Sequence, residues 1–259
     1  GGPVDTAARV YADHLGRVLK QPVVVDNRAG ASGAIAAEIT AKAAPDGYTL
    51  YFVASPTMTM TPLIQKAVNF NPSRDFSHIG LITDYTNVLL INKDFPARNV
   101  GELVEYARKH PQGVAFGSAG VGASNHLSAE LLAQMSGVKM LHVPYKGNSP
   151  AMTDVISGKI AFMFDITGTA IGHIQSGKVR PLAVTSKERN AALPNVPTMV
   201  ESGLKDYAVT GWYALIGPPK LPAEVVDTLV KAQQTVGDDP AFRQRMTQGG
   251  YDLNITGPK

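Results

Sequence analysis

The segment FGSAGVGASNHLSAE, from Phe116 to Glu130, decides how this chain folds. An apolar strand that ends at Phe116 runs through small residues, three of them glycine, directly into an amphipathic helix. A strand followed by a turn and a helix is the repeating unit of α/β folds, and the first turn of the helix leaves backbone N–H groups without intrahelical partners. These donors and the positive end of the helix dipole favour a carboxylate or phosphate, each charge contact contributing roughly 0.3–1 kcal/mol. The segment therefore predicts an α/β fold with an anion-binding turn.

The composition of the 259-residue chain excludes several classes of protein. Hydrophobic residues make up 44% of it, which is enough for substantial cores. The 24 Lys and Arg residues exceed the 21 Asp and Glu residues by three, but the charges are scattered, so we expect no nucleic-acid partner. The absence of cysteine excludes disulfides and thiolate catalysis. The sequence contains no run of 18 apolar residues, so it predicts no membrane-spanning helix.

Short β-branched runs alternate with helical stretches, which is the pattern of mainly parallel sheets flanked by helices. We predict two such sheets in two lobes. In the first block the pattern predicts a helix at 4–20, a strand at 23–26 and a glycine-rich turn at 29–33. A second helix then runs from this turn to residue 43 and is followed by a turn at 45–47 and a strand at 48–54.

A second block is predicted to start near Asn99, which can cap a helix with Glu102 reaching back in a capping box. Here the pattern predicts strands at 114–116, 140–143, 160–164 and 181–185, and glycine-terminated helices at 124–135, 150–157 and 169–176. An apolar strand at 207–216 and helices at 223–236 and 240–249 then return the chain to the first block. The predicted lobes are 1–98 with 212–259, and 99–211, with a ligand cleft between them.

Motifs for other chemistries are incomplete. The glycines between Gly117 and Gly122 do not have dinucleotide-binding spacing, and no Walker A lysine follows. Ser118 lacks the first glycine of a nucleophile elbow. His126 and Glu130 lie one helical turn apart, but no third ligand stands at metal-site spacing. The remaining histidines are isolated, so we predict structural or surface roles for them, and neither metal nor cofactor.

Polar residues at predicted strand ends are further candidates. Asp165 ends the apolar strand IAFMF, where open α/β sheets contact ligands, and it could also cap the following helix. Ser55 and Thr57 follow the strand YFVA in the same way, although ordinary loop chemistry explains them equally well. Trp212 and Tyr213 are predicted to lie in the core.

Six blocks follow one another along the chain: GGPVD (1–5) with Ala8-Arg9, VVVDNRAGASG (23–33), PDGYTL (45–50), the 116–130 segment, HVPYKGNSPAMTDVISGKIAFMFD (142–165) and GWYALIGP (211–218). Together these blocks resemble the Bug-type solute receptors of tripartite tricarboxylate transporters. The resemblance covers nearly the whole chain in one order. The family implies a two-lobed fold like that of type II periplasmic binding proteins, which hold a ligand between lobes and deliver it to a permease without catalysis.

The resemblance also implies which residues bind the ligand. Backbone amides and ordered waters from the 1–5 loop and the 118–124 segment would hold one carboxylate, and residues around the distal end would discriminate among ligands. Relatives often carry serine in place of Ala123, so here a backbone contact is expected without that hydroxyl. An ionised Asp165 would disfavour a second carboxylate and favour a hydroxyl or ammonium group. The predicted ligand-binding residues are Gly1, Gly2, Asp5, Ser55, Thr57, Ser118, Ala119, Gly120, Ala123, Ser124, Tyr145 and Asp165.

We therefore predict a monomeric periplasmic receptor and not an enzyme. Its predicted ligand is a small mono- or dicarboxylate, such as an amino, hydroxy or aromatic acid, and its predicted partners are the membrane subunits of a transporter. The chain opens without a leader, and relatives carry an extra first strand and a longer tail, so we interpret it as trimmed, with any signal peptide removed. Two alternatives stay open: a carboxylate-sensing regulatory domain, and a hydrolase that uses Ser118 with His126, whose separation by about two helical turns argues against it.

Overall fold

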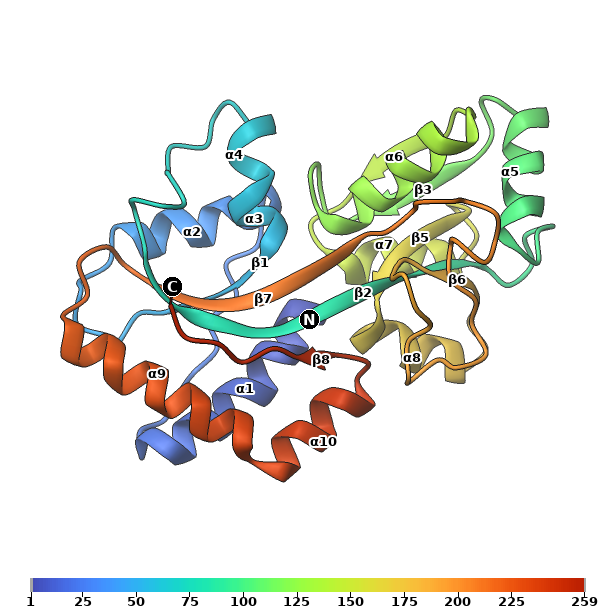
Figure 1. The fold of residues 1–259 in the computed structure, drawn as a ribbon. Helices are drawn as coiled ribbons and strands as arrows, with labels where there is room; N and C mark the ends of the chain where they lie inside the picture. Colours follow the sequence, from blue (N-terminus) through green and yellow to red (C-terminus); the bar gives the residue numbers. More distant parts are fainter. Residues whose placement is uncertain (1, 259) are drawn as a thin grey trace. The chain divides into compact units, whose positions relative to one another are not determined.

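The computed structural model describes residues 2–258, which form two compact units (Figure 1). Unit 1 contains Pro3–Tyr85 and the chain from Gly211 onward, and unit 2 contains Gly2 and Thr86–Thr210. The first boundary lies before the position near Asn99 that the sequence suggested. The reason is a 16-residue strand, β2 (Ser77–Asn92), which the sequence pattern did not reveal and along which the chain passes from unit 1 to unit 2.

Unit 1 is built around a small sheet. Its elements are α1 (Pro3–Leu19), η1 (Ala31–Gly33), α2 (Ala34–Ala41), β1 (Tyr51–Ala54), α3 (Ser55–Thr59), α4 (Thr61–Ile64), the first part of β2, β7 (Thr210–Gly217), α9 (Ala223–Asp238), α10 (Pro240–Gln248) and β8 (Asp252–Leu253). Strand β1 runs antiparallel to β7, which lies beside β2, and β8 runs antiparallel to β2. Tyr213 is fully buried and Trp212 packs partly buried against the core, as the sequence predicted.

The strand predicted at residues 23–26 is wrong. Within residues 2–258 this stretch belongs to no strand, and Val24 is 84% exposed. Its three consecutive valines have high β propensity, but propensity records how well a side chain fits a pleated surface and does not supply a neighbouring strand.

Unit 2 contains a mixed sheet between two helical layers. Its elements are the second part of β2, α5 (Val100–Lys109), β3 (Ala115–Ser118), α6 (Ser124–Ser136), β4 (Leu141–Pro144), α7 (Asn148–Ile156), β5 (Phe162–Ile166), α8 (Thr167–Gln175) and β6 (Val179–Val184). Strands β5, β3 and β4 are parallel, and β2 pairs antiparallel with β5 on one edge and β6 on the other. The α/β class is confirmed, and the antiparallel pairs arise because β2 enters this sheet from the opposite direction.

Alternation along β2 gives unit 2 its two cores. Leu89 and Ile91 pack on one face with residues of α5 and α6, whereas Val88 and Leu90 pack on the other with residues of α7 and α8. Successive side chains of a strand point to opposite faces, so both faces of β2 are covered. Among residues 2–258, no helix combines the length and apolar composition that crossing a bilayer requires.

Helix ends follow the predicted chemistry. The side chain of Asn99 caps α5, accepting the N–H of Glu102 at 2.9 Å. The Glu102 carboxylate accepts the N–H of Arg98 at 2.7 Å, one residue before the position that a capping box uses. Helix α6 ends at Gly137, whose φ of 63° lies in the left-handed region that glycine adopts without strain. These caps fix the start of α5 and the length of α6.

Candidate functional site

The polar residues of unit 2 gather at one edge of its sheet. Ser118 ends β3, Tyr145 follows β4, and Asp165 lies near the end of β5. Because these three strands are parallel, their carboxyl ends meet at the same edge, where open α/β sheets bind ligands. Asn87 of β2 is opposite Ile166 in the antiparallel register and reaches this edge from the other direction.

The turn from β3 to α6 depends on two glycines. Gly120 and Gly122 have φ values of 130° and 84°, in a region that residues with a Cβ rarely adopt. Ala123 then takes an extended conformation, with φ −64° and ψ 156°, directly before the first residue of α6. The small residues that marked this segment in the sequence therefore make the turn possible.

The first four N–H groups of α6 are not all available. Ala123 donates its N–H to the carbonyl of Gly120 at 3.2 Å, and His126 donates to the side-chain oxygen of Asn125 at 3.0 Å. Within residues 2–258, the N–H groups of Ser124 and Asn125 hydrogen-bond to no protein group. The anion-binding turn predicted from the sequence thus presents two unengaged donors.

The turn before α6 uses its own amides internally. Ala119 donates its N–H to the side-chain oxygen of Asn125 at 3.1 Å, and Gly120 donates to the hydroxyl of Ser118 at 3.1 Å. Gly122 donates to Nδ1 of His126 at 3.0 Å. The backbone donors proposed from the sequence at Ala119 and Gly120 are therefore engaged within unit 2.

Ser118 hydrogen-bonds to a histidine that sequence reasoning did not assign to it. Its hydroxyl lies 2.6 Å from Nε2 of His142, and His142 stacks on His126 with ring centroids 4.0 Å apart. Ser118 is completely buried. The hydrolase alternative paired Ser118 with His126, and this pairing is wrong because His126 accepts from Gly122 instead.

Both stacked histidines are held neutral. Burial, together with the neighbouring His126, lowers the pKa of His142 to about 4. Burial also lowers the pKa of His126, although Glu130 opposes this effect. An N–H donated to Nδ1 of His126 requires that this nitrogen carry no proton. At neutral pH the pair therefore adds shape and hydrogen-bond acceptors, but no positive charge.

Asp165 is buried and fully bonded. One carboxylate oxygen accepts the N–H of Ile166 at 2.9 Å and the side-chain amide of Asn148, and the other accepts the hydroxyl of Thr169 at 2.7 Å. Burial raises the pKa of this carboxyl, and the three donors oppose the rise. Ile166, not Asp165, is the cap residue of α8, so Asp165 supports the first turn of that helix through Thr169.

Three buried asparagines extend this network and were missed in the sequence. Asn125 donates its side-chain N–H to Asn148 at 3.3 Å, and Asn87 donates to the hydroxyl of Ser128 at 3.3 Å. The hydroxyl of Ser124 lies 3.5 Å from the side-chain oxygen of Asn87, at the limit of a hydrogen bond. Asn125 and Asn148 lie on the first turns of α6 and α7, which is the signal that could have identified them, whereas Asn87 lies inside the missed strand β2.

Tyr145 is tied to unit 2 at both ends. Its N–H donates to the carbonyl of Ser118 at 3.0 Å, and its hydroxyl donates to Asp154 at 2.8 Å. Burial, with the adjacent Asp154 carboxylate, raises the pKa of Tyr145 to about 12. The hydroxyl is therefore protonated at neutral pH and its hydrogen is already donated.

Asp5, Ser55 and Thr57 are the predicted site residues that lie in unit 1. Asp5, in the first turn of α1, forms an ion pair with Arg9 at 2.9 Å. Partial burial acts to raise its pKa, but hydrogen bonds from Arg9 and Asn27 hold the pKa below its usual value. Gly2 is half-buried directly before α1, and Gly1 lies outside the described residues.

Ser55 and Thr57 differ in whether their hydroxyl hydrogens are already donated. The hydroxyl of Ser55 accepts the N–H of Trp212 at 3.2 Å, which leaves its hydrogen available to donate. Thr57 donates its hydroxyl hydrogen to the carbonyl of Ser32 at 3.0 Å. Of the two, Ser55 is therefore the better donor toward a ligand.

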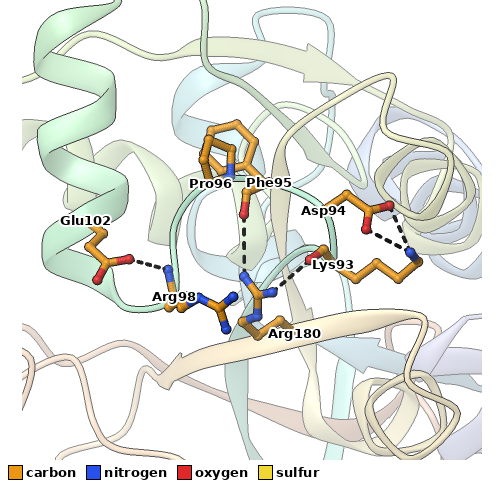
Figure 2. A pocket seen from close by; sticks show the side chains of 7 residues that line it. All are labelled: Lys93, Asp94, Phe95, Pro96, Arg98, Glu102 and Arg180. Carbon is orange, nitrogen blue, oxygen red and sulfur yellow. Dashed lines mark hydrogen bonds and ion pairs between the residues drawn. The ribbon is translucent and has the colours of Figure 1, made fainter.

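Figure 2 shows a second polar feature of unit 2, a hollow of about 410 Å³. It is lined by Lys93, Asp94, Phe95, Pro96, Arg98, Glu102 and Arg180. Arg180 donates to the carbonyls of Lys93 and Ala97, each at 2.8 Å, and so holds the loop that follows β2. This loop follows the carboxyl end of β2, at the sheet edge opposite Ser118 and Asp165. In the described part of the chain, no three metal-ligating side chains are grouped to hold an ion.

Comparison with known proteins decides the family. The family model described as "Tripartite tricarboxylate transporter family receptor" matches residues 7–256. The chain belongs to this receptor family. Solved structures agree: the periplasmic binding protein BugD is 38% identical, with a TM-score of 0.95 over 99% of this chain and 86% of that chain. The sequence-based resemblance to Bug-type receptors and to their fold is thereby confirmed.

Two other similar solved structures contain organic acids. MatC from Rhodopseudomonas palustris, with bound malate, is 31% identical, with a TM-score of 0.92 over 98% of this chain and 86% of that chain. Another R. palustris protein, with adipate, is 31% identical, with a TM-score of 0.95 over 98% of this chain and 85% of that chain. These relatives are receptors and binding proteins, and they support neither the regulatory nor the hydrolase alternative.

Proposed function

We propose that this receptor binds a small mono- or dicarboxylate in the periplasm and delivers it to the membrane subunits of a tripartite tricarboxylate transporter. The observation that carries the ligand class is the pair of unengaged N–H groups at Ser124 and Asn125. They lie in the first turn of the 13-residue helix α6, where the helix dipole favours a negative charge. Malate and adipate in two similar receptors support a carboxylate as the anion.

The surrounding groups favour a carboxylate held by hydrogen bonds without a cationic partner. His126 and His142 are neutral at neutral pH, so the positive contribution at this turn comes from the backbone. The carboxyl group of Asp165 already accepts hydrogen bonds from three donors of unit 2. Adjacent N–H groups can each donate to one oxygen of a carboxylate, and charge-assisted hydrogen bonds of this kind are about twice as strong as neutral ones.

The remaining ligand-binding candidates, Gly1, Gly2, Asp5, Ser55 and Thr57, rest on the family resemblance. Ser55 is our principal candidate for discrimination among ligands, because its hydroxyl hydrogen is available. The hydroxyl hydrogens of Thr57 and Tyr145 are already donated, so these residues can act only as acceptors or by contact.

Isothermal titration calorimetry of the ligand-stripped protein tests the function. The panel contains malate, adipate, an amino acid, an aromatic acid and the diamides of malate and adipate. We expect saturable one-to-one binding of at least one acid and no binding of its diamide, because the amide lacks the charge that the helix terminus favours. Equal binding of acid and diamide, or no binding of any acid, would contradict the proposal.

A further inference from the structure

A continuous chain of buried side chains leads from Asp165 to the anion-binding turn. Asn148 donates its side-chain N–H to Asp165 and accepts the side-chain N–H of Asn125 at 3.3 Å. The oxygen of Asn125 accepts two backbone N–H groups, from Ala119 at 3.1 Å and from His126 at 3.0 Å. Asn125, Asn148 and Asp165 are 2%, 9% and 1% exposed, so water does not compete freely for these bonds.

The two ends of this chain impose the same orientation on it. The Asp165 oxygen that faces Asn148 also accepts the N–H of Ile166, so Asn148 turns its NH₂ group toward Asp165 and its oxygen toward Asn125. Asn125 must then turn its NH₂ group toward Asn148, which leaves its oxygen facing the N–H groups of Ala119 and His126. A reversed Asn125 would bring its NH₂ group against these two donors and leave them unsatisfied in a buried site.

The consequence concerns how many donors the turn offers to a ligand. The segment from Ala119 to His126 carries N–H groups on both sides of the Ala123 cap, and Asn125 engages one on each side. Within residues 2–258, the N–H groups of Ser124 and Asn125 stay without a protein acceptor. A planar carboxylate has two oxygens and is matched by such a pair, whereas a tetrahedral phosphonate or phosphate presents three oxygens and needs a wider set of donors.

We propose that Asn125, anchored through Asn148 to Asp165, is the positioning residue that adapts this turn to carboxylates. It engages the N–H groups of Ala119 and His126 and so presents only the adjacent pair at Ser124 and Asn125. Asp165 acts as the anchor of this relay through Asn148. The inference rests on the proposed function for its ligand, but the relay itself can be measured without any ligand.

The first test uses Asn125→Ala with the ligand-free protein. Amide hydrogen exchange followed by NMR should show protected N–H groups at Ala119 and His126 in the parent protein. In the variant both should exchange at least about tenfold faster, because a lost hydrogen bond of about 1.4 kcal/mol corresponds to that factor. Unchanged exchange at both positions would overturn the relay, whether or not any acid binds.

The second test measures selectivity by calorimetry, with malate and its phosphonate analogue as probes. The parent should prefer malate, and Asn125→Ala should narrow that preference by about tenfold, since two further donors become free to meet a third oxygen. A general loss of packing would weaken both ligands and leave their ratio unchanged, and that result would overturn the positioning role. Failure of the parent to bind malate or any acid of the panel would instead refute the proposed function.

A charge swap tests the anchor and covers the case in which Asn125→Ala does not fold. Asn148→Asp places two carboxylates face to face with no donor between them, so malate affinity should fall. Adding Asp165→Asn restores a donor between the two side chains and lets residue 148 still accept from Asn125, so affinity and selectivity should recover. No recovery in the double variant would overturn the relay and favour direct contact of Asp165 with the ligand.

Discussion

Replacing Ser124 with proline removes one of the two unengaged donors while the helix should remain intact. Ser124 is the first residue of α6, a position where proline is favoured because the missing N–H has no intrahelical partner. Proline also requires an extended residue before it, and Ala123 already has φ −64° and ψ 156°. The substitution therefore affects ligand binding much more than folding, and we expect the free energy of unfolding to change by less than about 1 kcal/mol.

The expected loss of affinity follows from the charge on the ligand. A hydrogen bond to a charged group contributes about 1.5–3 kcal/mol, so losing the Ser124 N–H should raise the dissociation constant by roughly 10- to 150-fold. Ser124→Ala is the matched control, since it removes the same hydroxyl but keeps the N–H. That hydroxyl makes only a 3.5 Å contact with Asn87, so the control should change affinity by less than about threefold.

Calorimetry with the best-bound acid of the panel, together with urea unfolding of each variant, provides the assay. If Ser124→Pro binds the acid as tightly as Ser124→Ala at unchanged stability, the N–H of Ser124 does not hold the ligand and the reasoning fails. If both variants lose affinity equally, the hydroxyl and not the backbone donor is responsible, which also refutes it.

Three further predictions concern acidity, discrimination and packing. Because the folded pKa of His142 lies near 4, below its unfolded value, its neutral form adds stability that is complete above about pH 6.5 and is lost as the pH falls through 4. Urea unfolding at pH 7 and 4.5 should therefore show that His142→Gln loses less stability at the lower pH than the parent does. An equal loss of stability in both proteins would contradict this. Ser55→Ala should change the ranking of acids in calorimetry more than it changes the affinity for a monocarboxylate, and an unchanged ranking would remove Ser55 from the distal site. Leu132→Ala, in the fully buried core of unit 2, should lower the free energy of unfolding measured in urea by about 2–5 kcal/mol. Leu63→Ala should lower it by about 0.5 kcal/mol or less, because Leu63 is 79% exposed. Similar losses in the two variants would contradict the packing described.

The sequence predicts best where short-range chemistry decides the structure. The glycine-rich turn, the start of α6 at Ser124 and the Asn99 cap depend on neighbouring residues, and all three are found where expected. The sequence predicts the structure poorly where pairing between distant strands decides it. β2 was missed, and the strand expected at residues 23–26 does not form, because strand formation depends on a partner far along the chain.

The candidate site shows the same division. Sequence reasoning predicted an anion-binding turn but counted all of its N–H donors as free, because the bonds that engage some of them come from side chains placed by the fold. Asn125 lies within the motif, yet its role depends on Asn148 and Asp165, which other strands and helices bring to it. The pairing of Ser118 with His142 likewise comes from the register of β3 and β4, in which Phe116 is opposite His142.

A crystal structure of the protein with the tightest-binding acid tests the central claim most directly. We predict a ligand carboxylate whose oxygens lie about 2.7–3.0 Å from the backbone nitrogens of Ser124 and Asn125, directly or through one ordered water each. An acid bound elsewhere, with both of these N–H groups facing solvent or another protein group, would contradict the account.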